Sequence, residues 1–402
     1  MHLGFALFTM QEKAVFVLIM GKTTSSKWMK SVNQQKVLRL IYTEGPISRV
    51  ELAEKTGLTQ QTITNIVKRL IDDDILMETS PVSSNGGRKP IPLVVKSKQL
   101  YAVGIEIAVK YIRGSLLDFE NNLLMEVTEE VPVYKDEYHP LEYIDKVISR
   151  LLQAVPEPSK LQGIGCSIQA LVDAERGVII YSPGLRWRNF PLGEKLSSKY
   201  DVPIYLENDV NLLALVENLK GSLAQSQHNV TVKFDYGIGG AIVTNKQLNA
   251  GAGFTAGEFG HYKAFRGERA LRCHCGTSGC LTTLASISGL ARNAGYELEQ
   301  FHQMLLDQDS EAEALFGTIT DAIVEALGNV ITLVNPDHVL LAGKWIDQMK
   351  EIAFPLIQER LYDMLPSFSR DVKLIMLPET PDESVSAAGL VMNHFFEVPI
   401  HL

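Results

Sequence analysis

Residues 253–280 read GFTAGEFGHYKAFRGERALRCHCGTSGC, and this stretch carries most of the information about the second part of the chain. Three of the four cysteines of the 402-residue chain fall in its last eight positions: Cys273, Cys275 and Cys280. The glycines between them permit a tight turn that brings three thiolates onto one ion. Tetrahedral zinc needs a fourth ligand, which either His261 or His274 can supply. The alternative is three free thiols, but buried structural cysteines seldom cluster so closely.

The cysteine content also bears on the cellular compartment. Four cysteines in 402 residues do not make a disulfide framework, and their spacing fits a metal site in a reducing cytoplasm better than secretion. Residues 1–20 are apolar, but the Gln-Glu-Lys at 11–13 splits them into runs too short to span a bilayer. No basic region or small-residue cleavage site is present. We expect residues 1–28 to form a frayed or buried N-terminal extension, unless translation begins at Met20 or Met29.

Charge is divided unevenly along the chain. The whole sequence has 38 basic and 47 acidic residues, and its net charge of −9 would by itself argue against a DNA-binding protein. Residues 1–98 nevertheless carry 14 basic and 8 acidic residues, which leaves +6 for this part and −15 for the remainder. A basic head on an acidic body indicates a nucleic-acid-binding module fused to a domain that avoids nucleic acid. The length allows about two or three domains.

The basic head shows three short helical patterns. The first covers residues 33–43 and stops at a Glu-Gly-Pro sequence, and the second, residues 49–56, is capped by Ser48 and ended by Gly57. The third is capped by Thr59 and continues to about residue 72. Its apolar residues recur at the spacing of a buried stripe: Ile63, Ile66, Val67 and Leu70.

The polar side of the third helix carries the side chains that we expect to contact DNA. Amides and hydroxyls can hydrogen-bond base edges, and a lysine can reach phosphate. The predicted contacts are Thr59, Gln60, Gln61, Thr62, Thr64, Asn65 and Lys68. Strand patterns at 75–79 and 91–95 flank a glycine-freed turn whose Arg88 and Lys89 can enter a minor groove or grip a backbone. These features predict a winged helix-turn-helix domain over residues 29–97; the alternative is a three-helix protein-interaction module.

The body, residues 98–402, contains two similar strand patterns about 130 residues apart. The first β-meander is expected at 101–107, 111–118 and 123–127, and the second opens at 229–234 and 239–243. We place Gly104-Ile105-Glu106 at the first turn of the first meander. The repetition predicts two similar α/β lobes, an arrangement that favours a small-molecule site at their interface.

Acid and amide groups follow an apolar strand at residues 203–206. Glu207, Asn208 and Asp209 stand at the carboxyl end of this strand, where the ligand sites of α/β folds open. An aspartate there can accept a hydrogen bond from a hydroxyl group or act as a general base. Such a cluster serves about equally often as a helix N-cap and polar turn.

These motifs resemble the ROK family of sugar kinases, repressors and open reading frames. The resemblance rests on residues 207–209, 257–261 and 273–280 and covers about residues 98–395. With the winged helix in front, the chain resembles the repressor branch, which includes xylose, N-acetylglucosamine and Mlc-type regulators. The resemblance implies an α/β, actin-like (ribonuclease H-like) fold of two lobes. It also implies one structural zinc ion per chain, held by His261, Cys273, Cys275 and Cys280.

The same resemblance implies a sugar site. The residues that would face the sugar hydroxyls are Asn208, Asp209, Glu258 and His261. Asp209 matches the base of the kinases and would here be vestigial, and His261 would hold zinc with one ring nitrogen and meet the sugar with the other. Trp187 matches a family segment near the sugar site, where its ring would stack on the ligand or pack in the protein.

Two loops argue against kinase activity. Kinases of the family carry an Asp-x-Gly-Gly-Thr loop in the first meander, whereas residues 106–110 here are Glu-Ile-Ala-Val-Lys. Side chains in place of the two glycines would crowd the amides that should meet phosphate oxygens. The second loop keeps Gly237–Gly240, but Asp235 before it would repel phosphate if it faced the site. Thr282 stands where kinases usually place a sugar-binding glutamate, and we predict that the chain is not an enzyme.

The sequence therefore predicts a cytoplasmic, sugar-responsive transcriptional repressor of a carbohydrate-utilisation operon, with no membrane association. We expect a homodimer or higher homo-oligomer on a palindromic operator, released by a sugar in the body, with xylose as the first candidate. Two alternatives stay open. One is a sugar kinase with a DNA-binding head, and the other is a repressor controlled by a transporter protein, which Thr282 favours because it weakens the sugar site.

Overall fold

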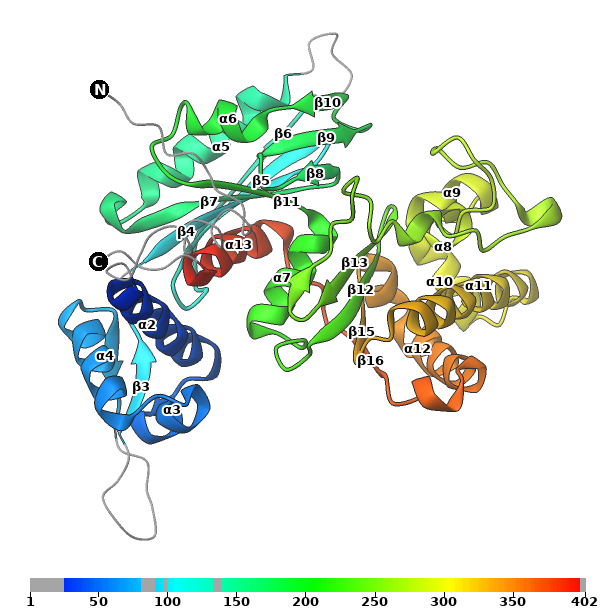
Figure 1. The fold of residues 1–402 in the computed structure, drawn as a ribbon. Coiled ribbons are helices and arrows are strands. Elements are labelled where there is room, and N and C mark those ends of the chain that lie inside the picture. Colours follow the sequence, from blue (N-terminus) through cyan, green and yellow to red (C-terminus); the bar gives the residue numbers. More distant parts are fainter. Residues whose placement is uncertain (1–24, 81–90, 97, 99, 133–138, 398–402) are drawn as a thin grey trace. The chain divides into compact units, whose positions relative to one another are not determined.

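The computed structural model describes residues 25–80, 91–96, 98, 100–132 and 139–397 (Figure 1). Contacts divide the chain into two units, one from the described parts of 1–99 and 394–402 and one from those of 100–393. Residues 394–397 thus group with the head, whereas the ranges expected from the sequence place them in the body. The N-terminal segment before Ser25 and the wing tip with Arg88 and Lys89 lie outside the described residues.

The first unit consists of helices and a small antiparallel sheet of order β1-β3-β2. Its elements are α2 (Ser25–Glu44), β1 (Ile47–Ser48), α3 (Arg49–Thr56), α4 (Gln60–Asp72), β2 (Leu76–Glu78) and β3 (Pro92–Val95). Ser48 and Glu51 form a capping box that begins α3, and Gly57, at φ 71°, ends it. The predicted apolar stripe of α4 is buried. Helix α2 begins earlier than expected, and β1 was not expected because two residues carry no pattern.

The last turn of helix α13 (Glu383–Glu397) belongs to this first unit. The rings of Phe396 and of Tyr42 on α2 lie 4.9 Å apart, and both side chains are buried. Gln35 Nε2 on α2 donates a hydrogen bond of 3.4 Å to the carbonyl oxygen of Phe395. Residues from both ends of the described sequence therefore form one hydrophobic core.

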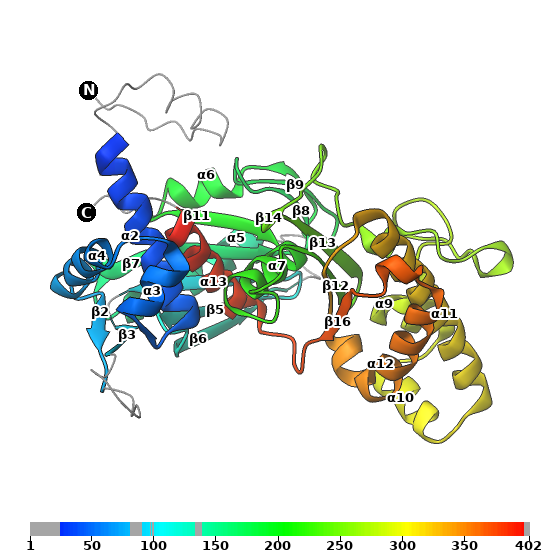
Figure 2. The same cartoon turned by 60° about the horizontal axis from the view of Figure 1, so that its bottom comes forward.

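The second unit contains two five-stranded sheets built on the same plan (Figures 1 and 2). In the order β11-β7-β4-β5-β6, the first contains β4 (Tyr101–Ile107), β5 (Tyr111–Asp118), β6 (Leu123–Glu130), β7 (Leu161–Ile168) and β11 (Ile204–Asn208). In the order β16-β15-β12-β13-β14, the second contains β12 (His228–Phe234), β13 (Ile238–Thr244), β14 (Gln247–Leu248), β15 (His338–Ala342) and β16 (Lys373–Met376). Each sheet is an antiparallel meander extended by two parallel strands beside its first strand.

This shared plan confirms the two similar lobes that the sequence predicts. One detail of the prediction is wrong. Gly104, Ile105 and Glu106 lie inside β4 and not at a turn, because the strand continues to Ile107 and the chain reverses over residues 108–110. All three residues are buried. Gly104 is needed because the backbone of another segment packs closely against it, and not because the chain turns there.

Helices cover both sheets. In the first lobe these are α5 (Pro140–Ala154) and α6 (Leu192–Ser197), beside a small sheet of β8 (Leu171–Asp173), β9 (Val178–Ser182) and β10 (Trp187–Phe190). In the second lobe these are α7 (Asp209–Lys220), α8 (Thr282–Ala285), α9 (Ile287–Ala294), α10 (Leu298–Leu306), α11 (Ser310–Val334) and α12 (Lys344–Met364). Helix α7 lies on one side of the second sheet and α10–α12 on the other (Figures 1 and 2). Short 3-10 turns lie at Pro158–Lys160, Phe259–His261, Gly267–Arg269 and Ser367–Ser369.

Helix α11 has the length and composition of a membrane-spanning segment. Of its most apolar window, however, 56% is buried inside the protein, and its inward residues, such as Ile323 and Leu327, belong to the core of the second lobe. Such a pattern is typical of the central helix of a folded domain.

The beginning of helix α13 lies directly on the first sheet at two glycines. A Cβ atom on Gly104 would come within 1.9 Å of the carbonyl oxygen of Ser384, and one on Gly165 within 1.9 Å of that of Ala387. Polar contacts fix the same turn, since the hydroxyls of Ser115 and Ser384 lie 2.8 Å apart. The first turns of α13 therefore have a fixed position on β4, β5 and β7.

Candidate functional site

The turn at 207–209 joins β11 to α7, as the sequence predicts, and uses its amide locally. The side-chain oxygen of Asn208 accepts hydrogen bonds from the backbone N–H groups of Val210 and Asn211, at 2.9 and 3.2 Å. Its Nδ2 donates to the carbonyl oxygen of Ala170 over 3.0 Å. Asn208 is therefore the N-cap of α7, which was the alternative reading of this cluster.

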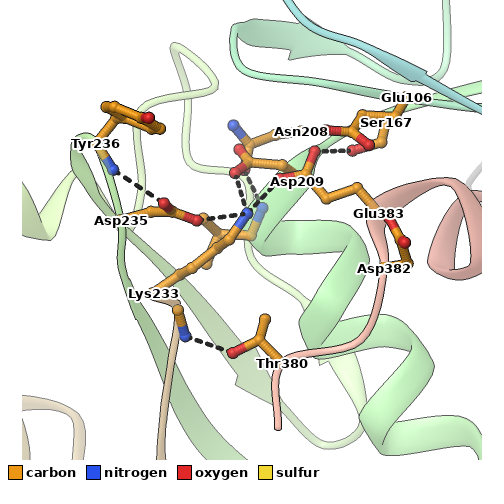
Figure 3. A network of polar contacts seen from close by, with 12 residues as sticks. Glu106, Ser167, Asn208, Asp209, Lys233, Asp235, Tyr236, Thr380, Asp382 and Glu383 are labelled. Carbon is orange, nitrogen blue, oxygen red and sulfur yellow. Dashed lines mark hydrogen bonds and ion pairs between the residues drawn. The ribbon is translucent and has the colours of Figure 1, made fainter. Parts of the chain in front are cut away.

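Asp209, the first residue of α7, meets a lysine that the sequence analysis did not single out. Lys233 Nζ on β12 donates to Asp209 Oδ2 at 2.9 Å and to Glu383 Oε1 at 2.5 Å, and it lies 3.8 Å from Asp235 Oδ2 (Figure 3). The Lys233 side chain is only 4% exposed. Burial alone would lower the pKa of Lys233, but the charges of Asp209 and Glu383 outweigh it and raise that pKa. Lys233 is therefore charged and paired.

Part of this cluster had a signal in the sequence. Lys233 interrupts an otherwise apolar strand, Val230-Thr-Val-Lys-Phe234, and a charged residue in a buried strand needs partners. No signal in the sequence pointed to Glu383. It lies 150 positions from Lys233, and only the packing of α13 on the first sheet brings it to the cluster.

Glu106 lies beside this cluster and has an unusual titration. Its Oε1 accepts a hydrogen bond of 2.6 Å from the hydroxyl of Tyr111, and Arg113 Nε lies 3.8 Å from its Oε2. Burial, followed by the charge of Glu383, raises the pKa of Glu106 to about 7. The Glu106 carboxyl therefore holds a proton at mildly acidic pH.

Replacing Glu106 by glutamine is expected to change how stability depends on pH. Because the pKa is about 7 in the folded chain and near 4.5 in the unfolded chain, the folded state binds this proton more tightly. The resulting stabilisation is complete below the unfolded pKa and is lost as the pH rises through the folded pKa. Between about pH 5 and about pH 8 the wild type should lose roughly 2.5 kcal/mol relative to Glu106→Gln.

Urea unfolding at both pH values measures this difference. Glu126→Gln, at an exposed carboxylate on β6, is the control for the change in net charge. Parallel pH dependence of the wild type and Glu106→Gln would contradict the prediction.

Glu258 and His261 lie together next to the cysteines. His261 Nε2 is 3.7 Å from Glu258 Oε2, and His261 Nδ1 is 3.7 Å from Cys273 Sγ. Two glycines allow this approach: a Cβ on Gly257, at φ 87°, would lie 2.2 Å from the carbonyl oxygen of Gly240. A Cβ on Gly260 would lie 2.2 Å from that of Ile238. The glycines of the 257–261 motif thus press its backbone against β13.

The four residues predicted as metal ligands come together. One donor atom from each of His261, Cys273, Cys275 and Cys280 lies within 4.8 Å of the others. The sulfur atoms of Cys275 and Cys280 are 3.7 Å apart, which is about the edge of a tetrahedron with bonds of ~2.3 Å to zinc. His274, the other candidate for fourth ligand, has its Nδ1 3.8 Å from Cys273 Sγ but is not part of this group. The set fits a tetrahedral ion of the kind that thiolates and imidazole bind.

A pocket of about 370 Å³ adjoins this cluster. It is lined by Val230, Gly240, Ala241, Ile242, Gly257, Glu258, Phe259, His261, Tyr262 and Val330. Two of the four predicted sugar-site residues line it, whereas Asn208 and Asp209 do not. Burial raises the pKa of Glu258, and the charge of Asp209 raises it further, so the two carboxylates lie near enough to interact.

Trp187 and Thr282, which the sequence analysis also considered for the sugar site, both pack within the protein. Trp187 on β10 stacks on Phe190, with ring centroids 4.4 Å apart, and packs against the core of the first lobe. This is the packing role that the sequence left as one of two alternatives. Thr282 begins α8 and is buried, and its carbonyl oxygen accepts a hydrogen bond from the hydroxyl of Ser286.

The predicted DNA-contacting residues of the head lie on α4. Thr59 caps the helix by accepting a hydrogen bond from the backbone N–H of Thr62. Four side chains are exposed on the face opposite the buried stripe: Gln61, Thr64, Asn65 and Lys68. Gln61 Nε2 donates to Asn65 Oδ1 over 3.3 Å, which pre-orients two amides on this surface.

Comparisons with known proteins agree with both units. A model described as the ROK family matches residues 102–390, and one described as winged helix-turn-helix DNA-binding matches residues 31–77. The chain belongs to the ROK family. Its head is a winged helix-turn-helix DNA-binding domain, and its body has the two-lobed actin-like fold that the sequence predicts.

Individual relatives match this chain over most of its length. The chain is 28% identical to the xylose repressor of Bacillus subtilis over 92% of its length and 97% of that protein's. It is 27% identical to the transcriptional dual regulator NagC of Escherichia coli, over 82% of its own length and 84% of that protein's. A crystal structure of a ROK family transcriptional regulator, described as a homologue of the Escherichia coli Mlc protein, matches with a TM-score of 0.76 at 24% identity and covers 92% of this chain and 97% of that one.

Proposed function

We propose that the protein is a sugar-responsive transcriptional repressor of a carbohydrate-utilisation operon. One observation carries the proposal: a winged helix-turn-helix with an exposed amide face is joined to a ROK body. By the resemblance to the family, Ala108 and Val109 would stand where the kinases carry the glycines of a phosphate-binding loop. Xylose is the first candidate effector, since a xylose repressor is among the similar proteins. The protein would act in the cytoplasm, as a homodimer whose recognition helices read half-sites about 34 Å apart.

Contacts in the first meander support a body that does not transfer phosphate. The backbone N–H of Ala108 donates to the carbonyl oxygen of Tyr111 over 3.1 Å, so this amide is already used. The side chain of Val109 lies against Gly184, where a Cβ would come within 2.6 Å of Val109 Cγ2. Asp209 Oδ2 already accepts a hydrogen bond from Lys233, which makes it a poor acceptor for a substrate proton.

The sugar and metal roles are parts of the same proposal. Asn208, Asp209, Glu258 and His261 would form the sugar site, and His261, Cys273, Cys275 and Cys280 would hold one structural zinc ion. Because His261 has one ring nitrogen toward Cys273 and the other toward Glu258, the ion would fix the ring that helps bind the sugar. Sugar binding releases DNA only if the sugar prefers the conformation that fits the operator poorly.

Operator binding with and without sugar tests the proposal. The DNA is obtained by selecting tightly bound fragments from a random duplex library with the purified full chain. D-xylose, D-glucose and N-acetylglucosamine are then added in a gel-shift titration, with calorimetry on the protein alone. We expect one sugar to weaken DNA binding by about tenfold or more. Unchanged DNA binding with every sugar, together with no heat of binding, would contradict the sugar-responsive role.

Replacing Gln61 by alanine is expected to weaken binding to the selected DNA about 10- to 100-fold, because an amide paired with a base edge contributes about 1–3 kcal/mol. Gln300→Ala, at an exposed glutamine on α10, is the matched control and should bind as the wild type does. Equal affinity of Gln61→Ala and the wild type would show that this face does not read DNA.

Two alternative functions give different results. A sugar kinase with a DNA-binding head would phosphorylate D-glucose or another hexose with ATP and lose that activity in Asp209→Asn. A repressor controlled by a transporter protein would bind DNA regardless of sugar and leave DNA only when that protein is added. Thr282, buried at the start of α8, is the residue that favours the second alternative.

A further inference from the structure

We propose that Lys233 is a tethered cation: its ammonium group joins carboxylates of different elements at the point where a divalent metal ion would bind if the lysine were absent. The proposal concerns a cation site within the body. It goes beyond the proposed function and does not depend on it, because its test needs neither a sugar nor an operator.

The contacts of Lys233 come from separate parts of the second unit. Asp209 begins α7, Asp235 follows β12, and Glu383 begins α13, whose first turns lie on the first sheet. Glu383 is itself held by Ser167 of β7, whose hydroxyl donates to Glu383 Oε2 over 3.1 Å. One ammonium group thus connects the second sheet to an element packed on the first (Figure 3).

The balance of charge at this point favours a cation with more than one charge. Three carboxylates approach one ammonium group within 3.8 Å. Several carboxylate oxygens around one point are the ligands that Mg²⁺ and Ca²⁺ prefer. A lysine side chain supplies a single charge but is covalently attached, so it cannot be lost to solvent or replaced by a competing ion. The cation is therefore part of the chain itself, whereas a metal ion would bind and dissociate.

Removal of the ammonium takes away the cation that the buried carboxylates of Asp209 and Glu383 share. A carboxylate left unpaired in a buried site costs several kcal/mol unless it gains a proton or a cation. A methionine at position 233 is uncharged and one atom shorter than lysine, so it leaves the place of Nζ free for a small ion. The structure thus predicts that Lys233→Met acquires a binding site for a divalent cation that the wild type lacks.

Thermal unfolding of Lys233→Met with added cations tests the proposal. Without divalent ions we expect its transition about 10 °C below that of the wild type. Addition of about 5 mM MgCl₂ should raise the transition of Lys233→Met by about 2 °C if the dissociation constant is about tenfold lower than this concentration. The wild type should not respond. Tb³⁺ luminescence with the two proteins measures binding directly.

Two further variants separate a cation site from general destabilisation. Lys233→Arg keeps the charge and should remain insensitive to Mg²⁺. The double variant Lys233→Met/Glu383→Gln lacks one of the carboxylates and should bind Tb³⁺ at least about tenfold more weakly than Lys233→Met. Where Lys233→Met aggregates, refolding from urea gives the same comparison, with recovery expected in MgCl₂ and not in NaCl of equal ionic strength.

Several results would overturn the proposal. These are equal stabilisation of the wild type and Lys233→Met by MgCl₂, equal Tb³⁺ affinity of the single and double variants, and equal refolding yields in the two salts. The first two would place the bound cation elsewhere in the protein. The third would assign Lys233 a purely structural role.

Discussion

Replacing Cys280 by serine is expected to remove one of the four residues proposed to hold zinc and to unfold the segment that carries Glu258 and His261. Residues between β14 and α8 form two 3-10 turns and isolated bridges, such as Lys263 with Cys280, and their other backbone hydrogen bonds are those of turns and loops rather than of long helices or sheets. In such segments the free energy of metal binding is the free energy of folding. We expect Cys280→Ser to lose more than about 5 kcal/mol of local stability and most of its bound zinc.

Metal content by mass spectrometry, together with thermal unfolding with and without a chelator, measures this effect. Cys166→Ala is the matched control, because Cys166 is fully buried in the first lobe and is not part of the metal group. The control should keep its zinc and lose about 1–2 kcal/mol through the small cavity that it creates. A wild-type protein that contains no metal and unfolds identically with a chelator would contradict the metal site.

Replacing Gly165 by alanine is the second change for which we expect a large effect. The new methyl carbon would lie 1.9 Å from the carbonyl oxygen of Ala387, which is backbone and cannot rotate away. Helix α13 would have to move off β7, and its contacts at Ser384 and Glu383 would move with it. We expect a loss of about 4 kcal/mol or more, at the upper end of the range for single substitutions.

The same substitution elsewhere gives the control. Gly317 lies inside α11, and a Cβ atom added there would meet no neighbouring atom within 4 Å, so Gly317→Ala should leave the protein unchanged or stabilise it by about 0.5–1 kcal/mol. Urea unfolding followed by tryptophan fluorescence compares the two variants. Similar midpoints for Gly165→Ala and Gly317→Ala would show that α13 does not press on β7.

Elements with local signals could be predicted closely from the sequence. Helix α3 begins and ends at the residues expected, because a Ser48 cap and the left-handed Gly57 are both local. Strands β4 and β5 also have the predicted bounds, because the runs of apolar residues that mark them are a local property of the sequence. The three cysteines were predictable as a group from their spacing, but the spacing left His261 and His274 as alternatives for the fourth donor, and only the family resemblance favoured His261.

Contacts between distant segments could not be predicted. Glu383 joins Lys233 only because α13 packs on two glycines of the first sheet, and no pattern near residue 383 reveals this. The grouping of Phe396 with the head likewise depends on packing and not on composition. The role of Asn208 was ambiguous for a different reason. A side chain of this type at the start of a helix can either cap the helix or contact a ligand.

The presence of the last turn of α13 in the head has a consequence for how the protein is made. The ribosome completes the segment up to residue 99 about 295 residues before it reaches His394. At typical rates of synthesis this delay is roughly 15–60 s. During that time the nascent head lacks Phe396, the partner of Tyr42. A nonsense mutation shortly before codon 394 would therefore remove Phe396 from the core of the DNA-binding unit, although this codon lies about 295 positions after the rest of that unit.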